Sequence, residues 1–200
     1  MRVAVLTFEG FNELDSFIAL PMLNRVKQPR LEALVVCPTE RVTSMNGVVV
    51  HAQAPLSFAR EADAVIVGSG IHTREIVKDA RLMAELKLDP SRQVIGAQCS
   101  GALVLAKLGL LGDLPACTDT TTKPWVQEAG IKVLDQPFVA HGNVATAGGC
   151  LASHYLAAWV ISRLAGWKAA EAVVHYVAPV GEKDAYVANA LRHVAPHLPR

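Results

Sequence analysis

The chain alternates short runs of mainly apolar residues with longer segments that repeat apolar residues every three to four positions. Runs at residues 2–7, 31–37, 64–67 and 93–97 have the length of strands, and few polar positions interrupt them. Continuous apolar strands are typical of parallel sheets that are buried on both faces. Residues 73–86 show the helical repeat. The pattern therefore predicts an α/β fold in which helices cover both faces of a mostly parallel sheet.

Two hairpins are expected beside the parallel strands. Asn46-Gly47 lies between β-branched stretches and predicts a hairpin over residues 42–51, and a second hairpin is expected over 138–146. Pro21 is expected to bend or interrupt the first helix. The other expected elements are a short strand at 116–118 and helices from about 12, at 100–108, 124–129, 150–164, 169–176 and 185–194. No linker separates these elements, so residues 1–200 are expected to form a single domain.

Composition and charge narrow the class of protein. Hydrophobic residues make up 52% of the chain and charged residues 18%, which excludes intrinsic disorder. The formal charge is only +1, so no overall positive field favours a nucleic acid as partner. No segment approaches the ~20 apolar residues of a membrane span, and the first apolar run is too short for a signal peptide. A cytoplasmic protein without a membrane partner is expected.

The four cysteines are widely spaced, at Cys37, Cys99, Cys117 and Cys150. This spacing is unlike a disulfide framework, so reduced thiols are expected. The sequence has no C-x-x-C pair and no close group of His and Cys, so no metal site is expected. Cys37, Cys117 and Cys150 are predicted to be packing residues, and no resolving cysteine is evident near Cys99.

Cys99 lies at the junction of the predicted strand 93–97 and the predicted helix 100–108. Ala97 and Gly101 are the small flanking residues that a tight strand-to-helix elbow needs. The amides of the first helical turn are expected to face the sulfur and to lower its pKa from ~8.5. An inert buried thiol is the alternative. The flanking residues favour a functional thiol, as does its place at the carboxyl end of a parallel strand.

Three motifs together resemble the ThiJ/PfpI superfamily. They are Asp15 at the end of FEGFNELD, the loop Gly68-Ser69-Gly70 and the elbow Cys99-Ser100-Gly101-Ala102, with weaker matches at 108–111 and 142–149. The resemblance covers nearly the whole chain. It implies a flavodoxin-like, three-layer α/β/α sandwich of the class I glutamine amidotransferase-like type.

Within that superfamily, the Leu-Asp placement and the elbow are most similar to two branches. One is the isocyanide (isonitrile) hydratase branch, and the other is the amidotransferase-like domain of certain AraC-type regulators. No helix-turn-helix region is evident in this chain and its charge is balanced, so the stand-alone enzyme form is expected.

The resemblance implies a role for several residues. Cys99 would be the nucleophile, and Asp15 the neighbouring carboxyl that exchanges a proton with it or with the substrate. The amides of Gly70 and Ser100 would hold an oxyanion. A carboxyl beside a thiolate in a dry pocket is expected to have a raised pKa, whereas the alternative for Asp15 is a solvated residue near a helix start. A homodimer without a cofactor is also implied.

Three further residues are candidates for the pocket. Many relatives carry a His after a Thr-Thr pair that follows the elbow helix. The spacing places Asp119 at that position in this chain, which weakens the case for a catalytic Cys-His pair. Ser100 stands where the protease-like branch has His, so peptidase activity is not favoured. His72, two residues beyond Gly70, is expected either to approach the pocket or to be a loop residue. Trp125 is expected to wall the pocket, or to pack at a helix start.

The leading hypothesis is hydration of a small isocyanide to an N-substituted formamide, through a thioimidate on Cys99. A glyoxalase or deglycase that acts on a dicarbonyl is an alternative, as is an amidase-type hydrolase. The non-enzymatic alternative is a redox or stress-responsive protein in which Asp15 holds an oxidised Cys99. A plain binding module is the remaining class.

Overall fold

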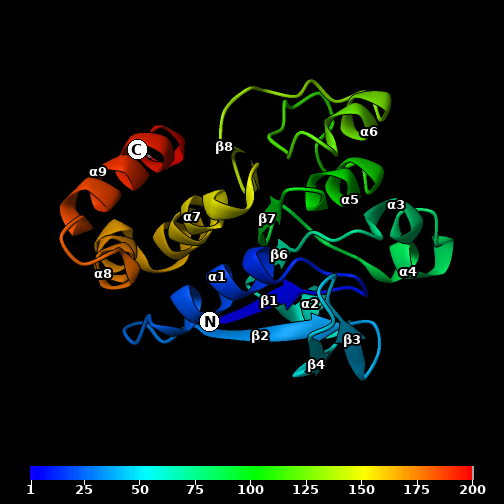
Figure 1. Cartoon of the computed structure of the whole chain (residues 1–200), viewed down its shortest axis with the longest axis horizontal. Coiled ribbons are helices and arrows are strands. Elements are labelled where there is room, and N and C mark those ends of the chain that lie inside the picture. The colour runs from blue at the N-terminus through cyan, green and yellow to red at the C-terminus, as the bar shows by residue number, and fades with distance from the viewer. Residues whose placement is uncertain (200) are drawn as a thin grey trace.

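A seven-stranded sheet lies at the centre of the computed structural model, which describes residues 1–199 (Figure 1). Its strands are β1 (Arg2–Leu6), β2 (Glu32–Cys37), β5 (Ala54–Pro55), β6 (Ala64–Val67), β7 (Val94–Gln98), β8 (Phe138–His141) and β9 (Val144–Ala147). Their order across the sheet is β5-β2-β1-β6-β7-β9-β8. Every neighbouring pair is parallel except β8 and β9. The mostly parallel sheet predicted from the apolar runs is confirmed.

Helices cover both faces of this sheet. They are α1 (Glu13–Asn24), α2 (Phe58–Glu61), α3 (Thr73–Ile76), α4 (Ala80–Glu85), α5 (Gly101–Lys107), α6 (Lys123–Glu128), α7 (Ser153–Ala165), α8 (Trp167–Val177) and α9 (Lys183–Val194), with single 3₁₀ turns η1 (Cys150–Ala152) and η2 (Ala195–His197). One face packs against α1, α7, α8 and α9, and the other against α2 to α6 (Figure 1). This is the predicted α/β/α sandwich.

The central strands are buried on both faces, which is why their sequences are continuously apolar. Val3 belongs to the core under α1 and α7, and its neighbour Ala4 belongs to the core under α5; both are fully buried. Close packing also depends on Gly96 in β7, where an added Cβ would lie 2.7 Å from Leu156 Cδ1 of α7. Glycine at this position therefore lets α7 lie directly against β7.

Both expected hairpins are present. In the first, β3 (Arg41–Thr43) pairs antiparallel with β4 (Val49–His51), and Gly47 in the turn has a φ of +87°. A left-handed conformation of this kind is one that glycine adopts without steric cost. In the second hairpin, β8 and β9 form the antiparallel edge of the main sheet.

Two helical expectations differ in detail. Pro21 does not interrupt α1, and its side chain is exposed, so the missing backbone bond lies on the solvent side of the helix. The helix expected over 73–86 divides into α3 and α4. The Asp79 side chain accepts hydrogen bonds from the amides of Arg81 and Leu82, at 3.0 Å each, and so caps the start of a new helix.

Short elements were the hardest to predict. The strand expected over 116–118 is only an isolated bridge between Ala116 and Val133. Conversely, β5 has two residues and α2 has four, which is too short for a periodic pattern to reveal either.

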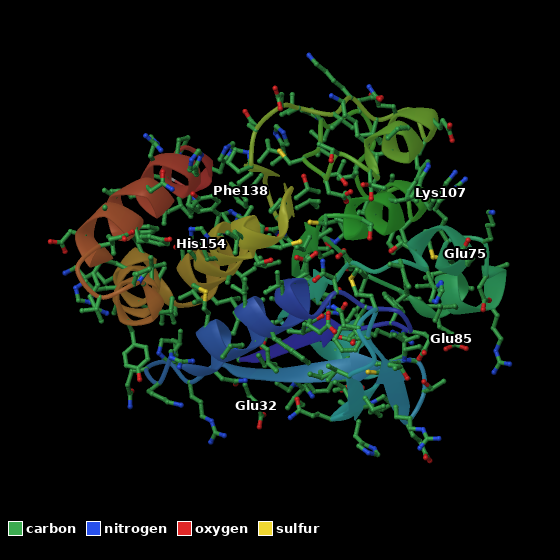
Figure 2. All side chains as sticks on the ribbon, in the orientation of Figure 1. Glu32, Glu75, Glu85, Lys107, Phe138 and His154 are labelled. Carbon is green, nitrogen blue, oxygen red and sulfur yellow. The ribbon has the colours of Figure 1, made fainter. Side chains whose placement is uncertain are left out.

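The outer surface carries charged side chains around the sandwich. Glu32, Glu85 and Lys107 are exposed at its periphery (Figure 2). Within residues 1–199, no helix has both the length and the apolar character needed to cross a bilayer.

Candidate active site

Cys99 occupies a strained elbow between β7 and α5. Its φ is +46°, and it is the only non-glycine residue with positive φ in the part of the chain that the structure describes. An added Cβ at Gly101 would lie 2.5 Å from the Val67 carbonyl oxygen, so only glycine lets α5 begin this close to β6. The Cys99 amide donates to the Ala147 carbonyl at 2.8 Å, which ties the elbow to β9. Backbone strain of this kind persists where the surrounding structure enforces it, and here the tight elbow expected from the small flanking residues is present.

Asp15 comes from the first turn of α1 and is completely buried. Ser69, in the loop after β6, donates a hydrogen bond to its Oδ2. The Ser153 hydroxyl at the start of α7 lies 3.5 Å from Oδ1. Hydroxyl groups from two other elements therefore hold the carboxyl in one position. Neither serine could be assigned a role from the sequence, because each becomes a neighbour of Asp15 only through the fold.

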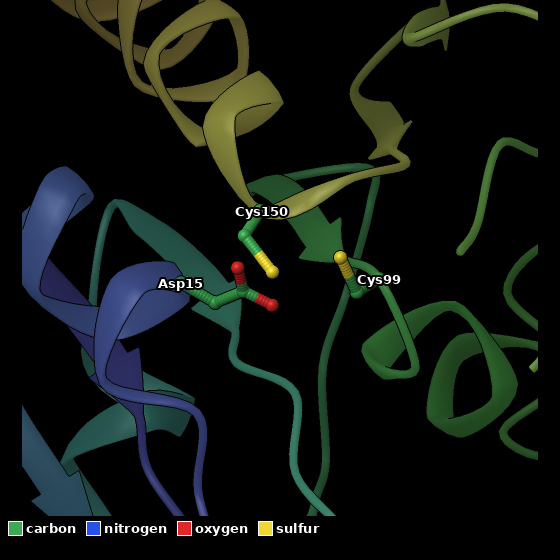
Figure 3. A group of neighbouring side chains, drawn as sticks. All are labelled: Asp15, Cys99 and Cys150. Atoms are coloured by element: carbon green, nitrogen blue, oxygen red, sulfur yellow. The ribbon is translucent and has the colours of Figure 1, made fainter. Parts of the chain in front are cut away.

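Cys150 is the unexpected member of the site. One ligand atom from each of Asp15, Cys99 and Cys150 lies within 4.8 Å of the other two. Figure 3 shows the three side chains converging from α1, the end of β7 and the start of the α7 segment. The Cys150 sulfur also accepts a hydrogen bond from Asn12 Nδ2 at 3.2 Å. The prediction that no other cysteine lies near Cys99 is therefore wrong.

The topology explains this proximity. β7 and β9 are parallel neighbours, with Gln98 paired to Ala147, so the segments that follow them leave the sheet at the same edge. The Gln98 amide reinforces the contact, because its Nε2 donates to the Gly149 carbonyl at 2.8 Å and lies 3.5 Å from the Cys99 sulfur. The sequence could not reveal that Cys150 lies beside Cys99, because the apolar pattern indicates each strand but not which strands are neighbours.

Burial dominates the electrostatics of the pair. It raises the pKa of the Cys99 thiol, and the neighbouring Asp15 carboxylate raises it further. Burial also raises the pKa of Asp15, while hydrogen bonds from Ser69 and Cys99 act in the opposite direction. The expected lowering of the Cys99 pKa is wrong in direction, because loss of hydration on burial is the largest effect on this thiol. Both effects favour the protonated form of the thiol, and an Asp15 carboxyl oxygen lies within 4.8 Å of its sulfur.

Alkylation by iodoacetamide tests this description. The thiolate is the reacting form, so Cys99 is expected to react slowly at pH 7 and faster as the pH rises beyond the ordinary thiol value of ~8.5. Asp15→Asn removes the neighbouring negative charge, so the rate profile of Cys99 is expected to move to lower pH. Peptide mass spectrometry measures the rate, with Cys37 as the internal reference because burial alone raises its pKa, to about 11. An Asp15→Asn profile that coincides with that of the wild type would contradict the assigned charge interaction.

Gly70 and Ser100 are brought together, but not as two free amides. The Gly70 amide donates to the Ser100 hydroxyl at 3.1 Å, and that hydroxyl lies 2.7 Å from Thr73 Oγ1. The Gly70 amide therefore already has a partner within the protein, and its role as an oxyanion donor stays a prediction. The Ser100 amide belongs to the start of α5, where backbone donors have no intrahelical acceptor.

The three candidate pocket residues lie in different surroundings. His72 is exposed beside Gly10 and forms no hydrogen bond with Asp15 or Cys99 in the described chain. Asp119 accepts from the amides of Thr121 and Thr122, at 2.9 Å each. Its charge acts on both Asp15 and Cys99, where it contributes to raising the two pKa values. Asp119 therefore acts on Asp15 and Cys99 through its charge. It forms no hydrogen bond to Cys99 among the described residues, as a histidine at this position of a Cys-His pair would.

Trp125 lines a cavity to which neither Asp15 nor Cys99 contributes. This cavity, of about 250 Å³, lies on the outer side of α5 and is also lined by Val77, Leu103 and Lys107. The Arg74 guanidinium lies over its ring, 4.5 Å from the centroid. The ring thus lies against side chains of α3 and α5, and a position of Trp125 beside Cys99 stays a prediction.

A larger apolar cavity lies elsewhere. It has a volume of about 720 Å³ and is bounded by α1, α7, α8 and α9, with Met22, Tyr155 and Val174 among its lining residues. Neither Asp15 nor Cys99 lines it. This volume is therefore separate from the buried thiol and carboxyl.

The three clustered residues also include ligand types that Zn²⁺ accepts, namely two thiols and a carboxyl. A structural zinc site has four protein ligands, and no other His, Cys, Asp or Glu belongs to this group within residues 1–199. The expectation of no metal site rested on the wide spacing of the cysteines and histidines in the sequence. That spacing did not reveal the cluster of Asp15, Cys99 and Cys150.

Comparison with known proteins identifies the family of this chain. Residues 1–163 match the DJ-1/PfpI family. Comparison with curated proteins gave no match. Among solved structures, Drosophila melanogaster DJ-1beta has a TM-score of 0.77 at 21% identity, with 88% of this chain and 96% of that chain covered.

Two other structures are similar at comparable identity. Schizosaccharomyces pombe DJ-1 has a TM-score of 0.74 at 19% identity, covering 90% of this chain and 100% of that chain. A ThiJ/PfpI family protein from Pseudomonas syringae has a TM-score of 0.74 at 19% identity, covering 97% of this chain and 87% of that chain. These structures share the fold. Since the family match spans most of the sequence and includes both Asp15 and Cys99, the chain belongs to the DJ-1/PfpI family.

Proposed function

We propose that this chain is a cysteine-dependent enzyme that acts on a small electrophilic carbon, and specifically that it hydrates isocyanides to N-substituted formamides. The observation that carries the proposal is the proximity of two buried groups, the Cys99 sulfur and an Asp15 carboxyl oxygen, which lie within 4.8 Å of each other. A thiol beside a carboxyl of raised pKa combines a nucleophile with a proton carrier. The burial of both groups favours a small uncharged substrate, because a charged one would lose its hydration.

The first half-reaction forms a covalent intermediate. The Cys99 sulfur attacks the terminal isocyanide carbon while Asp15 accepts the thiol proton. Asp15 then returns this proton to the same carbon, which gives a thioimidate with a C–S bond and a C–H bond. No net charge remains on the intermediate, so its formation suits a site in which burial disfavours ions.

The second half-reaction releases the product. Water adds to the thioimidate carbon while Asp15 carries one of its protons to the nitrogen, giving a tetrahedral adduct. The remaining hydroxyl proton then passes through Asp15 to the sulfur as the C–S bond breaks. The formamide departs and the Cys99 thiol is restored. Ser69 and Ser153 hold the carboxyl in place during these transfers, because they contact its two oxygens from different elements.

The proposal is tested by incubating purified protein with an alkyl isocyanide and following the formamide by NMR. The wild type is expected to form it catalytically, and denaturation during turnover is expected to trap a mass adduct on the Cys99 peptide. Asp15→Asn is expected to lower kcat by about 10²–10⁴-fold, because it removes the proton carrier. Asp79→Asn is the matched control, since this carboxylate bonds to the backbone amides of Arg81 and Leu82 at the start of α4 instead, and it is expected to stay within a few-fold of the wild type.

Two results would count against this function. The first is a wild type that consumes no isocyanide. The second is an adduct located on Cys150 instead of Cys99, which would assign the nucleophile to the other thiol of the cluster.

A further inference from the structure

Two cysteines that are far apart in the sequence share one buried cluster. The sulfurs of Cys99 and Cys150 lie within 4.8 Å of each other, and an Asp15 carboxylate oxygen lies within the same distance of both. Cys99 is only 3% exposed, whereas Cys150 is partly exposed. The proposed hydration uses Cys99 and Asp15 and leaves the second thiol without a role.

We infer that Cys99 and Cys150 form a reversible intramolecular disulfide, which makes the site a two-cysteine switch that responds to hydroperoxides. A disulfide has an S–S length of about 2 Å, so the sulfurs must approach by less than about 3 Å. Rotation about a Cα–Cβ bond moves a sulfur by a comparable distance. Cys150 begins the single 3₁₀ turn η1 and does not lie inside a long helix or a strand, so its backbone is less constrained than that of Cys99.

The first step oxidises Cys99. Its sulfur attacks one oxygen of the hydroperoxide, the O–O bond breaks, and Cys99 becomes a sulfenic acid. The thiol proton passes through Asp15 to the departing oxygen, which leaves as an alcohol, or as water when the oxidant is hydrogen peroxide. Two electrons are transferred from the sulfur to the peroxide.

The second step closes the disulfide. The Cys150 sulfur attacks the sulfenic sulfur, the S–S bond forms and the S–O bond breaks. The hydroxide that leaves combines with the Cys150 proton as water. A dithiol reductant reverses the change by thiol–disulfide exchange and is itself oxidised to a disulfide.

Neighbouring groups favour Cys150 as the attacking thiol. Burial and the Asp15 carboxylate raise the pKa of Cys150, and the hydrogen bond that Asn12 Nδ2 donates to its sulfur at 3.2 Å acts in the opposite direction. Asp15 is within reach to accept its proton. The Gln98 amide bonds to the Gly149 carbonyl, directly before Cys150, while its nitrogen also lies beside the Cys99 sulfur. These contacts hold the two sulfurs on the same side of the elbow.

Peptide mapping after treatment with hydrogen peroxide tests the inference. In the wild type, we expect a peptide pair linked through Cys99 and Cys150, loss of two free thiols per peroxide consumed, and recovery of both thiols with dithiothreitol. Cys37→Ser is the matched control, because this buried cysteine lies in a different core cluster, and it is expected to form the same linked pair.

Cys150→Ser distinguishes disulfide formation between Cys99 and Cys150 from oxidation of Cys99 alone. This variant is expected to accumulate a sulfenic acid on Cys99 that dimedone traps, and to proceed to the sulfinic acid with excess peroxide. A wild type in which Cys99 reaches the sulfinic acid while Cys150 remains free to alkylate would overturn the inference. So would a disulfide that links either cysteine to a second chain. The mapping needs no isocyanide, so its outcome is independent of the proposed hydration.

Discussion

Cys99→Ala is expected to reduce isocyanide hydration to the background rate, a loss of the order of 10⁶-fold for an enzyme that depends on a covalent nucleophile. The variant keeps the small side chain that the elbow accommodates and removes only the sulfur. Asp15 remains buried in it, held by Ser69 and Ser153, so general acid–base groups are present without a nucleophile. Steady-state formation of formamide, followed by NMR over hours, measures the residual rate.

Cys37→Ala provides the reference for this loss. Cys37 is buried at the end of β2 and lies outside the cluster formed by Asp15, Cys99 and Cys150. Its replacement is expected to leave turnover within a few-fold of the wild type. Appreciable turnover by Cys99→Ala would show that Asp15 acts directly on water and that the covalent route is wrong.

Trp159→Ala is expected to destabilise the fold by about 3–5 kcal/mol, the range for removal of a large aromatic side chain from a core. Trp159 is completely buried in α7, and its ring packs against Phe138 of β8 with the centroids 6.2 Å apart. Loss of the indole leaves a cavity between α7 and the antiparallel edge of the sheet. The midpoint of urea unfolding measures the change in the free energy of unfolding.

Trp159→Phe separates packing from hydrogen bonding at the same position. The indole Nε1 is buried and has no hydrogen-bond partner among the described residues. Phenylalanine keeps an aromatic ring and removes this unsatisfied donor, so the expected loss is less than about 1.5 kcal/mol. Equal destabilisation by the two substitutions would mean that the position requires the full indole volume.

Much of the fold was predictable because the central strands are buried on both faces. The run at residues 64–67 coincides with β6, and the hairpin around Asn46-Gly47 follows from the local turn chemistry. The elbow at Cys99 was predictable for a related reason, since the small residue Gly101 is a steric requirement that can be read locally.

The composition of the candidate site was only partly predictable. Cys99 was indicated by its elbow and Asp15 by the family resemblance, whereas Cys150 was missed, because its proximity depends on β9 being the neighbour of β7. The direction of the Cys99 pKa was predicted wrongly, because the effect of helical amides can be anticipated from position but the extent of burial cannot. Trp125 illustrates the same limit, since the side of α6 on which a ring lies depends on packing. The homodimer and the cytoplasmic location stay predictions.

The contacts around Asp15 join residues that are 138 positions apart, both between Asn12 and Cys150 and between Asp15 and Ser153. Contacts of such large sequence separation form late in folding, after the entropy cost of closing long loops has been met. During synthesis, the Cys99 segment is therefore made well before the residues that complete its surroundings. Until the start of α7 docks beside α1, both thiols have the ordinary reactivity of an unfolded chain, and the distinctive chemistry of this site begins only when these two segments meet.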